Sequence, residues 1–178
     1  EATRTAFYER YRFAEVFASL RRAPETLAAE IQALPGVQAV ETRVVVATDV
    51  TVPGFGEPVQ GGFLSLPDRG PPVLNVPHLR AGRLPDPGHF DEVALGEAFA
   101  LGHGLRPGDH LFANLDGTRR RLEVVGIVLS PEFVYAIAPG AMMPDDKRYA
   151  LVWMTRAALA GAFDLDGAFN EVSLTLLR

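Results

Sequence analysis

Apolar and polar positions near the start of the chain predict a strand, a helix and a second strand. Residues 12–20 fit either a helical face or a strand, and we favour a strand because a helix signal follows closely. Pro24 fits the first position of that helix, and Pro35-Gly36 ends it. Residues 37–52 alternate and are rich in Val and Thr, which predicts one long strand.

The end of the chain predicts the same order of elements. Residues 149–154 form a compact apolar run typical of a strand, and Thr155 can cap a following helix. Asp166-Gly167 then makes a turn, and residues 169–177 alternate as a strand does. Two such units commonly pack as a split βαβ, ferredoxin-like sheet with helices on one face.

Residues 53–148, between these two units, differ in composition. They hold 12 of the 14 prolines and the pair Gly61-Gly62, which we interpret as turn residues. We expect a short strand and a short helix within residues 90–101, and a hairpin around Asp116-Gly117. The segment therefore reads as mostly β-structure.

Taken together, these elements predict an α+β fold with two lobes. Residues 1–52 and 149–178, at the two ends of the chain, would form the split βαβ lobe. Residues 53–148 would form a β-rich lobe inserted between the two halves of the first lobe.

Composition then narrows the class of protein. The chain has 178 residues, of which 48% are hydrophobic, and a net charge of −5, which excludes disorder as its main state. The acidic balance argues against a nucleic-acid partner, since the only dense basic cluster is Arg119 to Arg121. The absence of Cys excludes disulfide scaffolds, thiol nucleophiles and Cys-ligated zinc.

The chain contains no apolar run near the ~20 residues that a membrane span requires. It starts at Glu1 without Met and stops inside an apolar run that begins at Val172. We expect it to be a fragment of a larger protein.

No familiar catalytic or metal-binding motif is present. The His residues lack the His-Glu-x-x-His spacing of a zinc site, and no Ser lies in a Gly-x-Ser-x-Gly elbow. If the chain were a periplasmic hydrolase, its candidate residues would be Asp145, Asp146 and His89. We expect no catalytic residue, no cofactor and no metal.

An apolar stretch surrounds a Pro/Gly-rich loop in the last third of the chain. Phe133, Tyr135, Met142 and Met143 either pack in the core or form an adaptable contact surface for a partner or substrate, a use that suits Met. The sequence leaves both interpretations open. As a further alternative, Trp153, Phe133 and Tyr135 would line the pocket of a small-ligand binding module.

Several short motifs follow one another in a characteristic order. They are a Gly-Arg pair after a strand (79–84), an apolar strand leading into a helix (90–100), a Gly-Asp turn (104–109) and a Val-Val-Gly-Ile strand (122–127). Each motif alone is weak, but their order and spacing resemble the extracytoplasmic domain of MacB/FtsX-type ABC transporter permeases. The strand–helix–strand units at both ends agree with this resemblance.

The resemblance implies a domain between the first and second transmembrane helices of a permease, on the periplasmic or extracellular side of the cell membrane. It implies a porter-like lobe formed by both chain ends and an inserted β-rich lobe. The partners would be a cytoplasmic ATP-binding subunit or domain and a second permease copy, through membrane helices that this chain lacks. The domain would be non-catalytic and would couple ATP hydrolysis to efflux, to lipoprotein or peptide transport, or to a partner outside the membrane by mechanotransmission.

Overall fold

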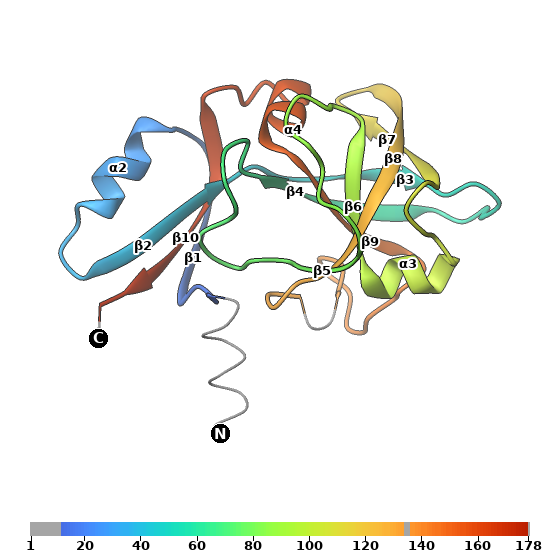
Figure 1. Cartoon of the computed structure of the whole chain (residues 1–178), viewed down its shortest axis with the longest axis horizontal. Helices are drawn as coiled ribbons and strands as arrows, with labels where there is room; N and C mark the ends of the chain where they lie inside the picture. Colours follow the sequence, from blue (N-terminus) through green and yellow to red (C-terminus); the bar gives the residue numbers. More distant parts are fainter. Residues whose placement is uncertain (1–11, 134–135, 178) are drawn as a thin grey trace.

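The computed structural model describes residues 12–133 and 136–177, so that Tyr135 lies outside the described residues. Figure 1 shows a small sheet with one helix beside a larger body of strands. In chain order the elements are β1 (Val16–Pro24), α2 (Thr26–Gln32), β2 (Val37–Arg43), β3 (Val45–Thr51), β4 (Val59–Leu66), β5 (His78–Gly82), β6 (Glu92–Gly96), α3 (Glu97–His103), β7 (His110–Leu115), β8 (Thr118–Leu129), β9 (Tyr149–Thr155), α4 (Arg156–Ala162) and β10 (Ala168–Leu176). The mixed α+β class expected from the sequence is confirmed.

The small sheet is antiparallel, with strand order β1-β10-β2. Helix α2 packs on it because Leu27 and Ile31, one turn apart, contact the buried side chains of Phe169 and Val172 on β10. The strand and helix expected at the start of the chain are therefore present. Pro24, however, is the last residue of β1 and not the first of the helix, since α2 begins two residues later.

The larger sheet has the order β5-β8-β6-β9-β4-β3-β7, and β7 also pairs with β8. This second pairing closes six of the strands into a ring, with β5 attached outside it. Closure works because β8 is long: Leu122 in its first half pairs with Leu111 of β7, while Ile127 in its second half pairs with Leu95 of β6. The body of the larger sheet is therefore a small mixed barrel.

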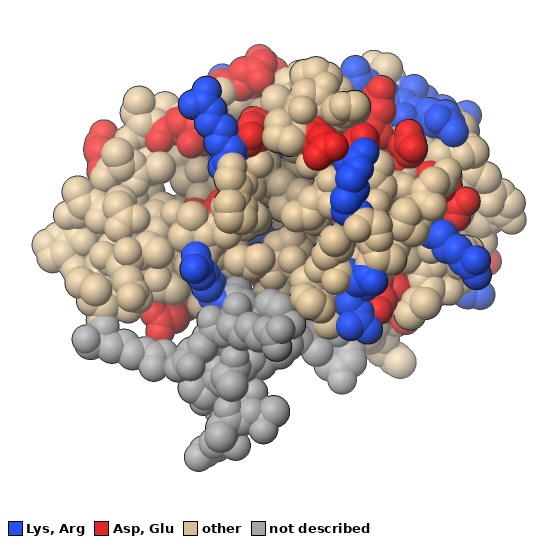
Figure 2. Space-filling view, viewed as in Figure 1, with Lys and Arg blue, Asp and Glu red and all other residues tan. Residues whose placement is uncertain are grey.

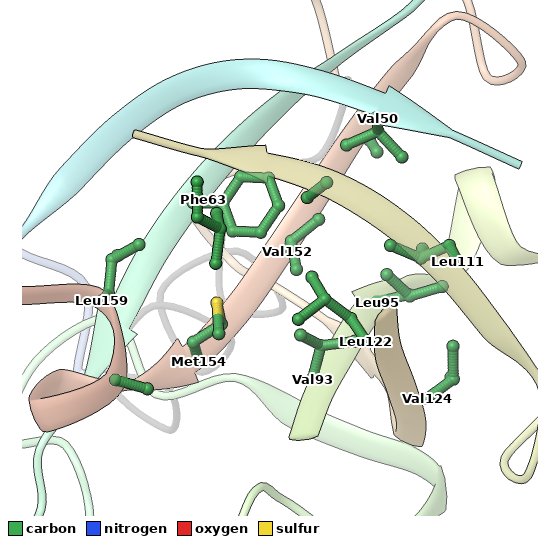
Figure 3. Close-up of a cluster of buried hydrophobic side chains, with 14 of the residues drawn as sticks. Val50, Phe63, Val93, Leu95, Leu111, Leu122, Val124, Val152, Met154 and Leu159 are labelled. Atoms are coloured by element: carbon green, nitrogen blue, oxygen red, sulfur yellow. The ribbon is translucent and has the colours of Figure 1, made fainter. Parts of the chain in front are cut away.

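Side chains on β4 and β9 alternate between the inside and the outside of this barrel. Phe63 and Val152 belong to the cluster that fills the interior, which Figure 3 shows, and both have 0% exposed surface. Their neighbours Leu64 and Trp153 belong to a second buried cluster on the outer face. A Cβ on Gly61 would lie 2.6 Å from the Phe63 ring, so this glycine makes room inside the barrel and is not a turn residue.

The split βαβ arrangement is not confirmed. The alternating run over residues 37–52 is two strands and not one, because the chain leaves the small sheet at Val44 and enters the barrel as β3. Val44 is fully buried, and its backbone N–H and carbonyl bond the hydroxyl and the backbone N–H of Ser65, at 2.8 and 2.9 Å. The unit at the end of the chain is divided in the same way, with β9 in the barrel and β10 in the small sheet.

The lobe limits expected from the sequence, 1–52 with 149–178 against 53–148, stay a prediction. Helix α4 begins after Thr155 as expected, but the Thr155 side chain makes no capping hydrogen bond. The carboxylate of Asp68 accepts from the backbone N–H of Ala157 instead, at 3.1 Å from each oxygen.

Candidate functional site

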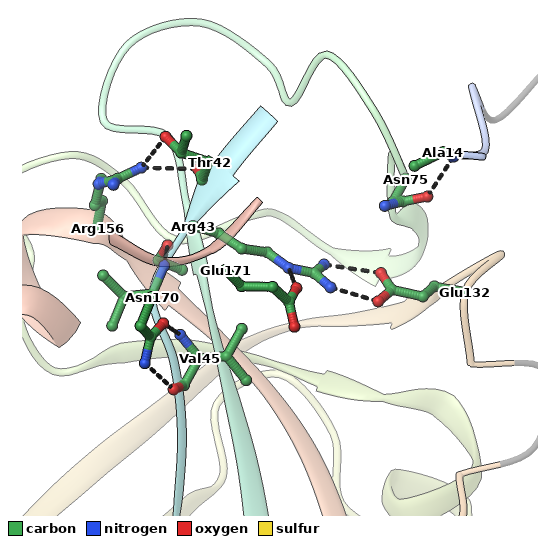
Figure 4. A network of polar contacts seen from close by, with 11 residues as sticks. Ala14, Thr42, Arg43, Val45, Asn75, Glu132, Arg156, Asn170 and Glu171 are labelled. Carbon is green, nitrogen blue, oxygen red and sulfur yellow. Dashed lines mark hydrogen bonds and ion pairs between the residues drawn. The ribbon is translucent and has the colours of Figure 1, made fainter. Parts of the chain in front are cut away.

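The two sheets are joined by a set of polar contacts that we call the junction, shown in Figure 4. Arg43, at the end of β2, donates from Nη1 to Glu132 Oε2 at 2.8 Å and from Nη2 to the other oxygen of the same carboxylate. Its Nε donates to Glu171 on β10. A single guanidinium therefore ties the small sheet to the segment that follows β8.

Burial governs the electrostatics of this group. Arg43 is only 8% exposed. Burial raises the pKa of Glu171, and the positive charge of Arg43 opposes that rise. The pKa of Arg43 is raised, because its bonds to Glu132 and Glu171 outweigh the effect of burial. The buried guanidinium of Arg43 thus has a carboxylate partner on each sheet-joining side, Glu132 and Glu171.

Two further contacts complete the junction. The side-chain amide of Asn170 accepts from Val45 N–H at 2.7 Å and donates to Val45 carbonyl at 2.8 Å, in the manner of a paired strand. Arg156, on α4, donates to the carbonyl of Thr42 at 2.8 Å and to that of Ala168 at 3.1 Å. Both points at which the chain passes between the sheets are therefore held by hydrogen bonds.

A cavity of about 370 Å³ lies against the outer face of the barrel. Its lining comes from β9, from the end of β6 and the start of α3, from the end of β8, and from the loop between β8 and β9. These residues are Gly96, Glu97, Ala98, Phe99, Val128, Leu129, Ser130, Phe133, Ala136, Pro144, Asp146, Tyr149, Leu151 and Trp153. The volume falls in the range of small-molecule sites.

The described parts of the loop that lines this cavity, residues 130–133 and 136–148, are held near both ends of the loop. At its start, Glu132 is bound by Arg43 of the junction. Near its end, Nε2 of His103 lies 2.8 Å from the Lys147 carbonyl oxygen. Arg148 also bonds Asp145 at 3.0 Å.

The apolar residues expected to form a contact surface take two different positions. Met142 and Met143 are exposed, at 96% and 75%, so they are not core residues. Phe133 is half-buried and packs edge-on against Trp153, with 6.5 Å between ring centroids. Phe133 and Trp153 do line one cavity, and Tyr135 lies outside the described residues.

The hydrolase candidates do not come together as a catalytic group. The Asp145 carboxylate accepts from the backbone N–H groups of Lys147 and Arg148, and the Arg148 guanidinium lowers its pKa. His89 lies 3.3 Å from Glu92. Over residues 12–133 and 136–177, no group of His, Asp and Glu is arranged to hold a metal ion.

Acidic and basic side chains are interspersed on the face that Figure 2 shows. Among the described residues, no helix combines the length and the apolar character needed to cross a membrane.

No protein-family model matches the chain, and no curated protein matches it. Solved structures do. The extracellular domain of the ABC-type transporter YknZ from Gram-positive bacteria aligns over 91% of this chain and 82% of its own length, with a TM-score of 0.56 and 12% identity. The periplasmic region of MacB from Actinobacillus actinomycetemcomitans aligns over 86% of this chain and 64% of its own, with a TM-score of 0.53 and 12% identity.

The chain therefore shares its fold with the extracellular domain of YknZ and with the periplasmic region of MacB. The resemblance seen in the order of the sequence motifs is thereby confirmed at the level of the fold.

Proposed function

We propose that the chain is the extracytoplasmic domain of an ABC transporter permease, and that it performs no covalent chemistry. The observation that carries this proposal is the match to the YknZ extracellular domain over most of both chains. The ordered motifs within residues 79–127 support it independently. A cytoplasmic ATP-binding subunit or domain and a second permease copy would be its partners.

The geometry of the first and last strands suits a domain inserted between two membrane helices. β1 and β10 are antiparallel neighbours, so the start of β1 and the end of β10 lie side by side. The N–H of Glu15 donates to the Leu174 carbonyl at 2.9 Å, and the N–H of Leu176 donates to the Glu15 carboxylate at 2.7 Å. Two helices that continued from these points would both pull on the small sheet.

The hydrogen bonds of the junction would transmit such a movement from the small sheet to the barrel. A displacement of β2 or β10 acts on Arg43 and Asn170, which are bonded to residues of the barrel and of the loop after β8. The two sheets would then move as a rigid unit, and a change in the membrane helices would reach the cavity side of the molecule.

In this proposal, the domain couples ATP hydrolysis to export or to a partner outside the membrane, as in efflux, lipoprotein or peptide transport, or mechanotransmission. Met142 and Met143, both strongly exposed, with Phe133 and Tyr135 from the same loop, form the candidate contact surface for that partner or substrate.

Labelling in intact cells tests the location. The chain has no Cys, so Met142→Cys in a cysteine-free full-length permease gives one exposed thiol. A membrane-impermeant maleimide should label it from outside. The matched control is Leu95→Cys, which is fully buried and should react only after denaturation. Labelling of Met142→Cys only after the membrane is permeabilised would overturn the proposal.

A further inference from the structure

We propose that the cavity between α3, β9 and the described parts of the loop after β8, residues 130–133 and 136–148, binds a small organic cation with a flat apolar body, such as an arylalkyl amine. This inference rests on the cavity alone and goes beyond the permease role. The cavity has the volume of a small-ligand site, about 370 Å³, and large buried side chains form its floor.

The walls favour a flat apolar group. Trp153 is 4% exposed and Phe99 is 2% exposed, and both line the cavity together with Leu151. Phe133 stands edge-on to Trp153 and closes one side. The two rings meet at 69°, and a flat ring of a ligand can pack against aromatic faces arranged in this way, which also attract a cation.

The charge of the lining selects a cation. Glu97 and Asp146 line the cavity, and among residues 12–133 and 136–177 no Lys or Arg does. Glu97 is already bonded to Arg80, at 2.8 Å. Asp146, in contrast, is exposed and has no hydrogen bond or ion pair within the part of the chain that the structure describes. One uncompensated negative charge therefore lies at the edge of an apolar cavity.

The remaining polar groups are neutral. Tyr149 and Ser130 are the uncharged hydroxyl-bearing residues of the described lining. Burial raises the pKa of Tyr149, so its phenol stays protonated and can donate or accept a hydrogen bond. An anionic ligand would be repelled by Asp146, and no Lys or Arg of the described lining would offset that repulsion. An ammonium group placed beside Asp146 would instead be attracted, and the aromatic ring of the same ligand could reach Trp153.

The cavity is also formed before binding. Its covering loop is held by the Arg43–Glu132 pair at one end and by the His103 contact with Lys147 at the other. A held loop reduces the ordering cost of binding, which helps a small ligand that makes few contacts.

The test uses intrinsic fluorescence, because Trp153 is the single Trp of the chain and lines the cavity. The complete 178-residue chain is titrated with 4-phenylbutylamine, 4-phenylbutanol and 4-phenylbutyrate, which share one apolar body and differ in charge. The proposal predicts a saturable change with the amine, about fivefold tighter binding than for the alcohol, and the weakest binding for the carboxylate. Equal affinities for all three, or no saturable signal with the amine, would overturn it.

Two variants separate charge from shape. Asp146→Asn should weaken binding of the amine about fivefold and leave the affinity for the alcohol unchanged. Asp91→Asn, which removes one exposed charge from a residue outside the lining, is the matched control and should change neither. Ala98 is an exposed residue of α3 that lines the cavity. A phenyl group at this position, in Ala98→Phe, should obstruct the cavity and weaken the binding of both the amine and the alcohol. An unchanged amine affinity in Asp146→Asn, or in Ala98→Phe, contradicts the proposed site.

Discussion

Replacing Arg43 with Met would remove the cation at the centre of the junction and keep most of the side-chain volume. Two carboxylates, Glu132 and Glu171, would then share a nearly dry site without a positive partner. Their side chains are 12% and 16% exposed, and that of Arg43 is 10% exposed. The variant therefore tests whether the two sheets depend on one buried ion-pair group.

The expected cost follows from burial. Removing one partner of a buried ion pair typically costs about 3 to 5 kcal/mol, because the remaining charge stays uncompensated. Both carboxylates keep some contact with water, which reduces the penalty for leaving them unpaired. We therefore expect Arg43→Met to lower the free energy of unfolding by about 3 kcal/mol, near the lower limit of that range. For a domain of this size, that loss corresponds to a fall in Tm of about 6 to 12 °C.

Urea unfolding of the wild type and of Arg43→Met measures this difference directly. Arg22→Met is the matched control, because Arg22 pairs with Asp164 at 3.7 Å while the two side chains are 54% and 97% exposed. An exposed pair of that kind contributes at most about 1 kcal/mol. If Arg43→Met cost no more than Arg22→Met, the account of the junction would be wrong.

The same variant has a predicted pH dependence. Burial already raises the pKa of Glu171, and loss of Arg43 removes the charge that opposes the rise. A carboxyl with a raised folded-state pKa destabilises the fold above that pKa, and the penalty is relieved as the pH falls through it. The difference in stability between Arg43→Met and the wild type should therefore shrink as the pH is lowered from neutral towards the raised pKa of Glu171. A difference that is constant over this range would contradict the electrostatic explanation.

Three further predictions concern the barrel and helix α4. The hydrogen bond from Arg83 lowers the pKa of Glu92 to about 2, so this carboxylate stabilises the fold above its unfolded-state pKa and loses that effect as the pH falls towards 2. Because Arg83 is half-exposed, Glu92→Gln should cost about 1 to 2 kcal/mol at neutral pH and remove this part of the acid sensitivity, as urea titrations at several pH values would show. Gly126→Ala would place a Cβ 2.0 Å from the Arg83 carbonyl oxygen, so the backbone must shift; we expect a loss of about 1 to 3 kcal/mol in the same assay, and an unchanged stability would refute the close approach. Asp68→Ala removes the acceptor for the Ala157 N–H at the start of α4 and should cost about 1 kcal/mol, whereas Asp68→Asn should retain most of it.

Elements defined by local pattern were predictable from the sequence. The strand and helix of β6 and α3, and the hairpin around Asp116-Gly117, lie where the pattern places them, because turn chemistry and spacing act over a few residues. The change of sheet at Val44 was not predictable. Three valines in a row fit one buried strand as well as two, and only the tertiary pairing with Ser65 decides between them.

Gly61-Gly62 illustrates a second limit. A pair of glycines in a Pro/Gly-rich region is typical of a turn, yet both lie inside β4. The reason is steric and distant in sequence: a Cβ on Gly62 would lie 2.6 Å from the Tyr149 hydroxyl. Such a requirement is visible only when β4 and β9 are placed side by side.

The cavity was predictable in part. In the alternative of a small-ligand binding module, Trp153, Phe133 and Tyr135 were to line a pocket, and the structure places Trp153 and Phe133 at one cavity. Glu97 and Asp146 were not expected there, since they are far apart in the sequence and only the docking of the loop on α3 brings both to one cavity. The feature that selects a ligand therefore came from the tertiary structure.

In the proposed function, this domain lies outside the membrane and moves with the ATPase of a permease. The most direct test is the distance between two Met142→Cys spin labels in a reconstituted full-length permease dimer with its ATP-binding partner. The distribution of distances between the two labels should change when ATP is added and trapped at the wild-type ATPase. The distribution should stay the same when ATP is added to an ATPase that cannot bind nucleotide. An identical distribution with and without trapped ATP, in a wild-type preparation that hydrolyses ATP, would contradict the proposed function.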